Sequence, residues 1–98
     1  MRYRYLTAAE FDQIDAAEYY ESQEPGLGAE FVEELDRAIL RILDHPHAGS
    51  PGPRDTRSSL MERFPYSVIY RVDPGEILIV AVQHHSRDPN RWQDRIFE

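Results

Sequence analysis

The sequence lacks cysteine, lysine and any long apolar run. Without cysteine the chain can form neither a disulfide framework nor a thiolate metal site. The longest apolar run, Ile77–Val82, is far too short to span a bilayer. The opening stretch MRYRYLTAAEF also has no apolar core of the kind found in signal peptides. These absences predict a soluble cytoplasmic protein with no membrane partner.

The charge is unevenly distributed over the 98 residues, a length that predicts one small domain spanning residues 1–98. Residues 1–50 contain eleven acidic residues and four arginines, whereas residues 51–98 contain seven of each. The net charge of −7 makes the protein a poor general binder of nucleic acid, because neutralisation of phosphates dominates that affinity. All eleven basic residues are arginine, which favours specific bidentate or stacked contacts over diffuse attraction.

The first half of the chain predicts a strand followed by two helices. Residues Arg2–Leu6 alternate polar and aromatic side chains, which is typical of a short strand. Thr7 and Glu10 have the spacing of a capping box, with Thr7 as the N-cap residue. A helix is expected from about Ala8 to Ser22, with its inward face formed by Phe11, Ile14, Ala17 and Tyr20 or Tyr19.

A turn at Pro25-Gly26-Leu27-Gly28 ends this helix, and a second helix is expected from roughly Ala29 to Asp44. Its apolar residues recur at helical spacing and should face inward: Phe31, Leu35, Ala38, Ile39, Ile42 and Leu43. Its charged residues should face outward: Glu33, Glu34, Arg37 and Arg41. His45-Pro46 ends the helix, and residues 47–56 are expected to form a loop.

The second half predicts three strands. Arg57–Phe64 is a strand candidate, Pro65 marks an edge, bulge or bend, and Tyr66–Val72 alternates as a strand does. Asp73-Pro74-Gly75-Glu76 provides a hairpin turn. Ile77–His84 is almost continuously apolar, which indicates a central strand buried on both faces. A short terminal helix is expected within residues 90–98, around Trp92 and Ile96.

This order predicts an α+β fold: a small, mostly antiparallel sheet with an N-terminal two-helix hairpin packed on one face (β-α-α-β-β-β). If Val68, Tyr70 and Val72 pack under the helices, Arg71 points to the opposite, less covered face. The register between strands decides whether Arg57 and Arg63 join it there, and the sequence leaves that register open.

The terminal cluster of the last strand contains two histidines, which invite a metal-binding interpretation. Neighbouring residues in a strand point to opposite faces, so His84 and His85 cannot chelate one ion together. The sequence therefore predicts neither a metal site nor a cofactor.

The chain resembles the RelE/ParE superfamily of toxins from bacterial type II toxin–antitoxin modules, the ParE-like branch in particular. The resemblance covers nearly the whole length. It depends on the order and spacing of these residues: Tyr19-Tyr20, Pro25-Gly26-Leu27-Gly28, Phe31, His45-Pro46, Arg57, the run from Arg63 to Arg71, Ala81-Val82, His84, Arg87-Asp88-Pro89 and Trp92.

The resemblance implies a cytoplasmic toxin that a cognate antitoxin holds inactive and that contacts DNA only indirectly, through that antitoxin. ParE-like relatives poison DNA gyrase, whereas RelE-like relatives cleave mRNA on the ribosome. A degenerate toxin that retains only antitoxin binding is a third possibility. We expect binding rather than enzymatic activity, with target or antitoxin contacts from Arg57, Arg63, Tyr66, Arg71, His84, Arg87 and Trp92.

The alternative is a metal-independent endoribonuclease, which needs a base, an acid and cations near the phosphate. The catalytic candidates are His84, His85 and Arg87, with Arg71 as a further cation. RelE-like enzymes are strongly basic, however, and often place a tyrosine near the end of the last strand, where this chain has Ser86. Trp92 either pins the C-terminal tail to the sheet or belongs to a partner interface.

Overall fold

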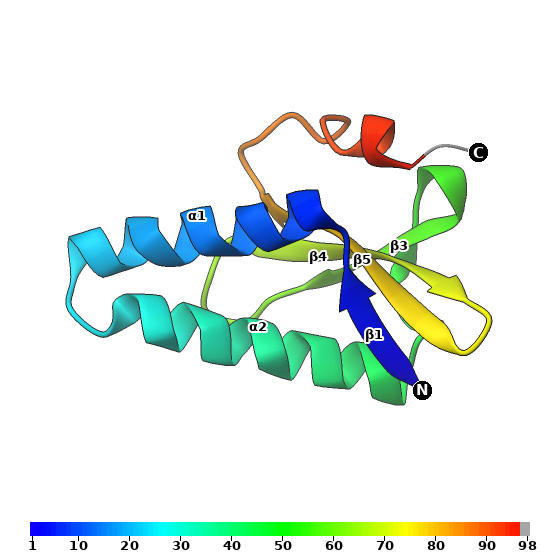
Figure 1. The fold of residues 1–98 in the computed structure, drawn as a ribbon, viewed down its shortest axis with the longest axis horizontal. Helices are drawn as coiled ribbons and strands as arrows, with labels where there is room; N and C mark the ends of the chain where they lie inside the picture. Colours follow the sequence, from blue (N-terminus) through cyan, green and yellow to red (C-terminus); the bar gives the residue numbers. More distant parts are fainter. Residues whose placement is uncertain (97–98) are drawn as a thin grey trace.

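The computed structural model of the protein describes residues 1–96. Two helices and a five-stranded sheet form the fold, and the strand order in the sheet is β1-β5-β4-β3-β2 (Figure 1). The elements are β1 (Arg2–Tyr5), α1 (Thr7–Gln23), α2 (Leu27–Asp44), β2 (Ser50–Pro51), β3 (Thr56–Leu60), β4 (Tyr66–Asp73) and β5 (Glu76–His84). The predicted α+β class and the element order are confirmed.

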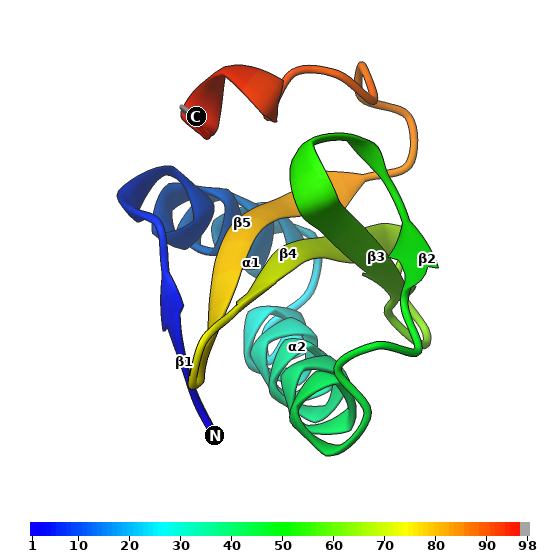
Figure 2. The same cartoon turned by 90° about the vertical axis from the view of Figure 1, so that its right-hand side faces the viewer.

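Both faces of the sheet are covered, by different parts of the chain. The helical hairpin packs on one face and the C-terminal tail crosses the other (Figure 2). Core residues under the helices include Phe31, Leu35, Val68, Tyr70 and Ile79. The second cluster consists of Ile69, Leu78, Val80, Ala81, Trp92 and Ile96. The predicted strand of residues 77–84 is therefore buried on both faces, as expected, although β4 occupies the middle of the sheet.

The strand pairing is antiparallel except between β1 and β5, the first and last strands of the chain, which run parallel. The strand expected at Arg57–Phe64 is shorter, ending at Leu60. The chain bends over residues 62–65 before β4, and within this bend Arg63 adopts a left-handed backbone conformation (φ 71°). The expected loop over residues 47–56 contains the two-residue strand β2, which pairs with β3.

The inward face predicted for α1 is confirmed for Ala17 and Tyr20, which pack against the core, and is wrong for Phe11 and Ile14. Phe11 and Ile14 are 58% and 47% exposed, and Tyr19 is also exposed, whereas Ala9 and Ala16 are buried. Small side chains face the core because α1 approaches α2 closely. The capping box is wrong as well: Leu6 is the N-cap residue, no side chain caps the helix, and Thr7 lies in its first turn.

Helix α2 buries the predicted apolar residues, with Leu43 partly buried. Glu34 departs from its predicted outward position and is buried, because Arg37 and Arg63 approach its carboxylate at 3.0 and 3.7 Å. At the start of α2 the Glu21 carboxylate accepts hydrogen bonds from the backbone N–H groups of Gly26 and Gly28. These donors have no partner within the helix, so Glu21 joins the two helices electrostatically.

The expected C-terminal helix is reduced to a single 3-10 turn, Gln93–Arg95. Residues 97–98 of that prediction lie outside the described residues. No helix within residues 1–96 combines the length and apolar character needed to cross a membrane.

Candidate functional site

The segment His84–Arg87, at the end of β5, lies between two surface hollows. The hollow on the helix side has a volume of about 280 Å³ and is bordered by Asp12, Tyr19, Tyr66, His84, Arg87 and Arg91, among others. The hollow on the opposite face has a volume of about 430 Å³ and is bordered by Arg57, Leu60, Ser67, His85, Arg87 and Trp92, among others. His84 and Arg87 border both hollows, so this segment is the ridge between them.

The two histidines point to opposite faces, as predicted. The ring of His84 meets Tyr66 edge to face, with centroids 4.9 Å apart, and its Nδ1 accepts a hydrogen bond from the backbone N–H of Ser86 (2.9 Å). Nε2 of His85 lies 3.0 Å from the hydroxyl of Ser67 on the other face. Within residues 1–96, no three side chains of the metal-ligating types converge on one point.

Arg87 is the cation of this ridge. Its side chain is exposed and makes no hydrogen bond or ion pair with the residues that the structure describes, whereas its backbone N–H donates to the carbonyl of His84. Its charge acts on Tyr66: burial raises the pKa of the Tyr66 hydroxyl, and the positive charge of Arg87 opposes that rise. An exposed guanidinium without an internal partner retains all its donors for a bound molecule.

Of the other predicted arginines, Arg57 borders the larger hollow together with Arg87, whereas Arg63 and Arg71 border neither hollow. Arg57 lies opposite Tyr70 in the register, hence on the helix side, and donates to the carbonyls of His47 and Gly49 at 3.0 and 2.9 Å. Arg63 pairs with Glu30 of α2 at 2.6 Å. Arg71 lies on the other face of the sheet, as predicted, and is held by both carboxylate oxygens of Asp73. The register thus places Arg57 and Arg71 on opposite faces of the sheet, and Arg63 lies outside the strands.

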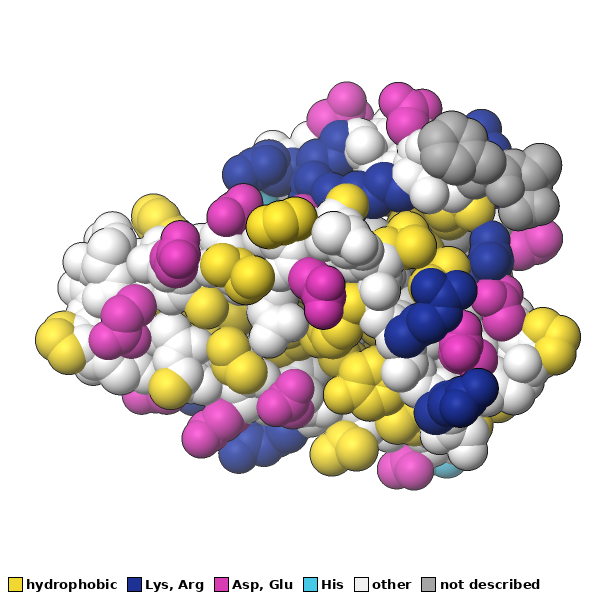
Figure 3. Space-filling model, in the orientation of Figure 1, with side chains coloured by type: hydrophobic (Ala, Val, Ile, Leu, Met, Phe, Trp, Pro, Cys, Tyr) yellow, Lys and Arg dark blue, Asp and Glu magenta, His cyan; other side chains and the backbone are white. Residues whose placement is uncertain are grey.

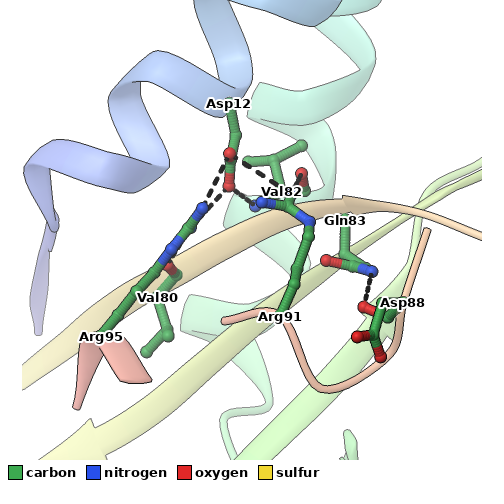
Figure 4. A network of polar contacts seen from close by, with 7 residues as sticks. All are labelled: Asp12, Val80, Val82, Gln83, Asp88, Arg91 and Arg95. Atoms are coloured by element: carbon green, nitrogen blue, oxygen red, sulfur yellow. Dashed lines mark hydrogen bonds and ion pairs between the residues drawn. The ribbon is translucent and has the colours of Figure 1, made fainter. Parts of the chain in front are cut away.

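Trp92 is only 4% exposed and packs on the sheet, so it pins the tail. An ionic cluster that local sequence patterns do not indicate holds the same tail (Figure 4). Asp12 of α1 accepts hydrogen bonds from Arg95 (2.7 and 3.1 Å) and from the backbone N–H of Val82 (3.0 Å). Arg91 lies 3.3 Å from the same carboxylate.

The ionic cluster around Asp12 and two further hydrogen bonds hold the C-terminal tail in place. Arg95 also donates to the carbonyl of Val80 at 2.9 Å, and Gln83 donates to the carbonyl of Asp88 at 2.9 Å. The tail is therefore tied to α1 and to β5 together, which fixes the backbone on both sides of Arg87 (Figure 4).

Comparisons with known proteins agree with this architecture. The family model described as "ParE toxin of type II toxin-antitoxin system, parDE" matches residues 3–89. The structure is similar to one described as "Chromosomal ParDE TA system from P. aeruginosa", with a TM-score of 0.74 and 20% sequence identity, covering 86% of this chain and 95% of that chain. No curated protein matches the sequence. At this identity the structural likeness shows a shared fold, whereas the family match covers most of the chain.

Proposed function

Because the chain belongs to the ParE toxin family of type II toxin–antitoxin systems, we propose that a cognate antitoxin holds it inactive and that the free toxin binds DNA gyrase in the cytoplasm. The observation that carries this proposal is the family match over residues 3–89, which includes both helices and all five strands. In this proposal the toxin acts by protein binding, and DNA is contacted only through the antitoxin.

Arg87 is the side chain best placed for a target contact. It lies on the ridge between the two hollows, and its guanidinium has no partner among the described residues. Arginine is enriched among the residues that dominate protein–protein binding energy, because its planar group forms several directed hydrogen bonds. Arg63 and Arg71 instead hold carboxylates within the protein, so their primary role in this proposal is structural.

A gyrase supercoiling assay with purified protein tests the proposal. The wild-type protein should inhibit supercoiling, and Arg87→Ala should weaken that inhibition about tenfold or more, the effect of losing a binding hot spot. Arg41→Ala is the matched control, because Arg41 also makes no ion pair with the described residues but lies on α2. Unchanged inhibition by Arg87→Ala would contradict the assigned contact.

One arrangement favours the ribonuclease as a second candidate: His84, Tyr66 and Arg87 border the same hollow, where they could serve as acid or base and as a phosphate-binding cation. A wild-type protein that leaves gyrase unaffected but cleaves mRNA on ribosomes would select this alternative. His84→Ala should then lower the cleavage rate by about 10²–10⁴-fold, the usual contribution of a positioned acid or base. Protein that causes no growth arrest without antitoxin would indicate a degenerate toxin.

A further inference from the structure

Helix α1 has a second apolar face that none of residues 1–96 covers. Phe11 and Ile14 lie one turn apart on the side of the helix opposite Ala9 and Ala16, which are buried against the core. Both large side chains are about half exposed or more. A helix that is apolar on its core side and again on its solvent side is typical of a helix that packs against a partner.

Acidic side chains surround these two residues. Glu10, Asp15 and Glu18 each lie three or four positions from Phe11 or Ile14, so they are neighbours on the helix surface. None of the three forms an ion pair with the described residues, and α1 contains no basic residue. Figure 3 shows hydrophobic and acidic side chains interspersed over the helices, whereas arginines gather over the tail and near β1. We refer to Phe11, Ile14, Glu10, Asp15 and Glu18 as the outer face of α1.

The negative charge of the outer face of α1 indicates which kind of partner can bind there. Two copies of the chain that met through α1 would bring their carboxylates together, and like charges oppose such contact. The tail of the chain itself is already docked elsewhere, because Arg91 and Arg95 are paired with Asp12. A partner segment that carries apolar residues on one side and arginine or lysine beside them would complement both the shape and the charge of the face.

We infer that the outer face of α1 is the docking surface for a basic amphipathic segment of the antitoxin. This inference rests on the proposed toxin–antitoxin function and specifies where one part of the antitoxin binds. Phe11 and Ile14 provide the apolar contact, whereas Glu10, Asp15 and Glu18 align the segment through its cations. Asp15 also borders the helix-side hollow that Arg87 borders, so the outer face of α1 adjoins the ridge.

Calorimetric titration of the toxin with the purified antitoxin encoded beside it tests the inference. The double variant Phe11→Ser/Ile14→Ser should bind the antitoxin at least tenfold more weakly, because it removes both apolar anchors. Leu40→Ser is the matched control: this leucine is 59% exposed and lies on α2. The control should bind within about threefold of wild type, since most exposed contacts contribute little.

A variant without two of the carboxylates measures how much their charge contributes to antitoxin affinity, apart from the apolar contact. Asp15→Asn/Glu18→Gln should weaken binding and reduce its dependence on salt, because salt screens exposed charge pairs.

Equal affinity of Phe11→Ser/Ile14→Ser and wild type would overturn the inference while leaving the proposed function intact. Wild-type toxin that fails to bind the antitoxin would instead overturn the proposed function and this inference with it. Wild-type dimers that Phe11→Ser/Ile14→Ser converts to monomers, measured by sedimentation, would assign the face to self-association and also overturn it.

Discussion

Asp12 illustrates how one side chain connects distant parts of the chain. Its carboxylate lies under α1 and receives the guanidinium of Arg95, which follows it by 83 positions, together with a backbone N–H group of β5. A largely buried carboxylate is stable only when hydrogen bonds and cations compensate for lost hydration. Asp12 therefore stabilises the native position of the tail, and loss of its charge would leave Arg95 without a partner in a partly buried site.

Asp12→Ala should lower the free energy of unfolding by about 3 kcal/mol, the usual cost of removing one partner from a buried ion pair. In a domain of this size that corresponds to a fall in Tm of roughly 12 °C or more. Thermal unfolding followed by the fluorescence of Trp92, the single tryptophan, measures the change. Asp15→Ala is the control and should shift Tm little, because Asp15 is exposed and unpaired among the described residues. Equal shifts for the two variants would show that the cluster contributes nothing specific.

At the scale of secondary-structure elements, the close contact between α1 and α2 determines which side chains face the core. Gly28 lies in the first turn of α2 and faces the carbonyl of Ala17 in α1, with the Glu21 carboxylate beside it. Because the backbones meet here, α1 presents alanines to the interior and leaves Phe11 and Ile14 outside. The apolar pattern of α1 alone could not distinguish its two faces.

Gly28→Ala should destabilise the protein although alanine is the better helix former. The added Cβ would lie 2.6 Å from the backbone oxygen of Ala17, so the helices must separate. We expect a loss of about 1–3 kcal/mol, the range for overpacked sites, measured by urea unfolding. Ala29→Gly at the adjacent exposed position should cost about 1 kcal/mol through helix propensity alone. A stabilised Gly28→Ala protein would contradict the close packing.

At the scale of the whole molecule, burial of tyrosine hydroxyls makes stability depend on alkaline pH. Burial is the largest cause of a raised pKa at Tyr5, Tyr20, Tyr66 and Tyr70. In the unfolded chain these hydroxyls lose their protons near pH 10, whereas the folded protein retains them to higher pH. The folded state then binds more protons than the unfolded state, so stability is fully present below about pH 10 and falls as the pH rises above it.

Urea unfolding between pH 8 and about pH 12 should show this fall, which begins near the pKa of free tyrosine. Tyr5→Phe should make the fall less steep, because it removes the group whose pKa is raised most strongly by burial and by Tyr3. Tyr19→Phe, at an exposed position, should change the slope less. A Tyr5→Phe protein with the same pH dependence as wild type would exclude Tyr5 as a contributor.

Local patterns in the sequence were sufficient for most elements. The alternation of Tyr66–Val72, the apolar run before His84 and the helical spacing from Phe31 to Ile42 each reflect a repeat that the backbone geometry imposes on neighbouring residues. The parity of neighbouring strand residues also placed His84 and His85 on opposite faces. Such inferences hold because they involve residues only a few positions apart.

The sequence by itself determined the order of the elements, the α+β class, the distribution of charge and the family to which the chain is similar. Only the tertiary structure decided that Arg57 and Arg71 point to opposite faces of the sheet, that the Arg87 side chain has no partner among residues 1–96, and that Phe11 and Ile14 face solvent. The physical reason is that strand register, helix–helix approach and ion pairs such as that of Asp12 with Arg95 depend on contacts between residues far apart in the chain.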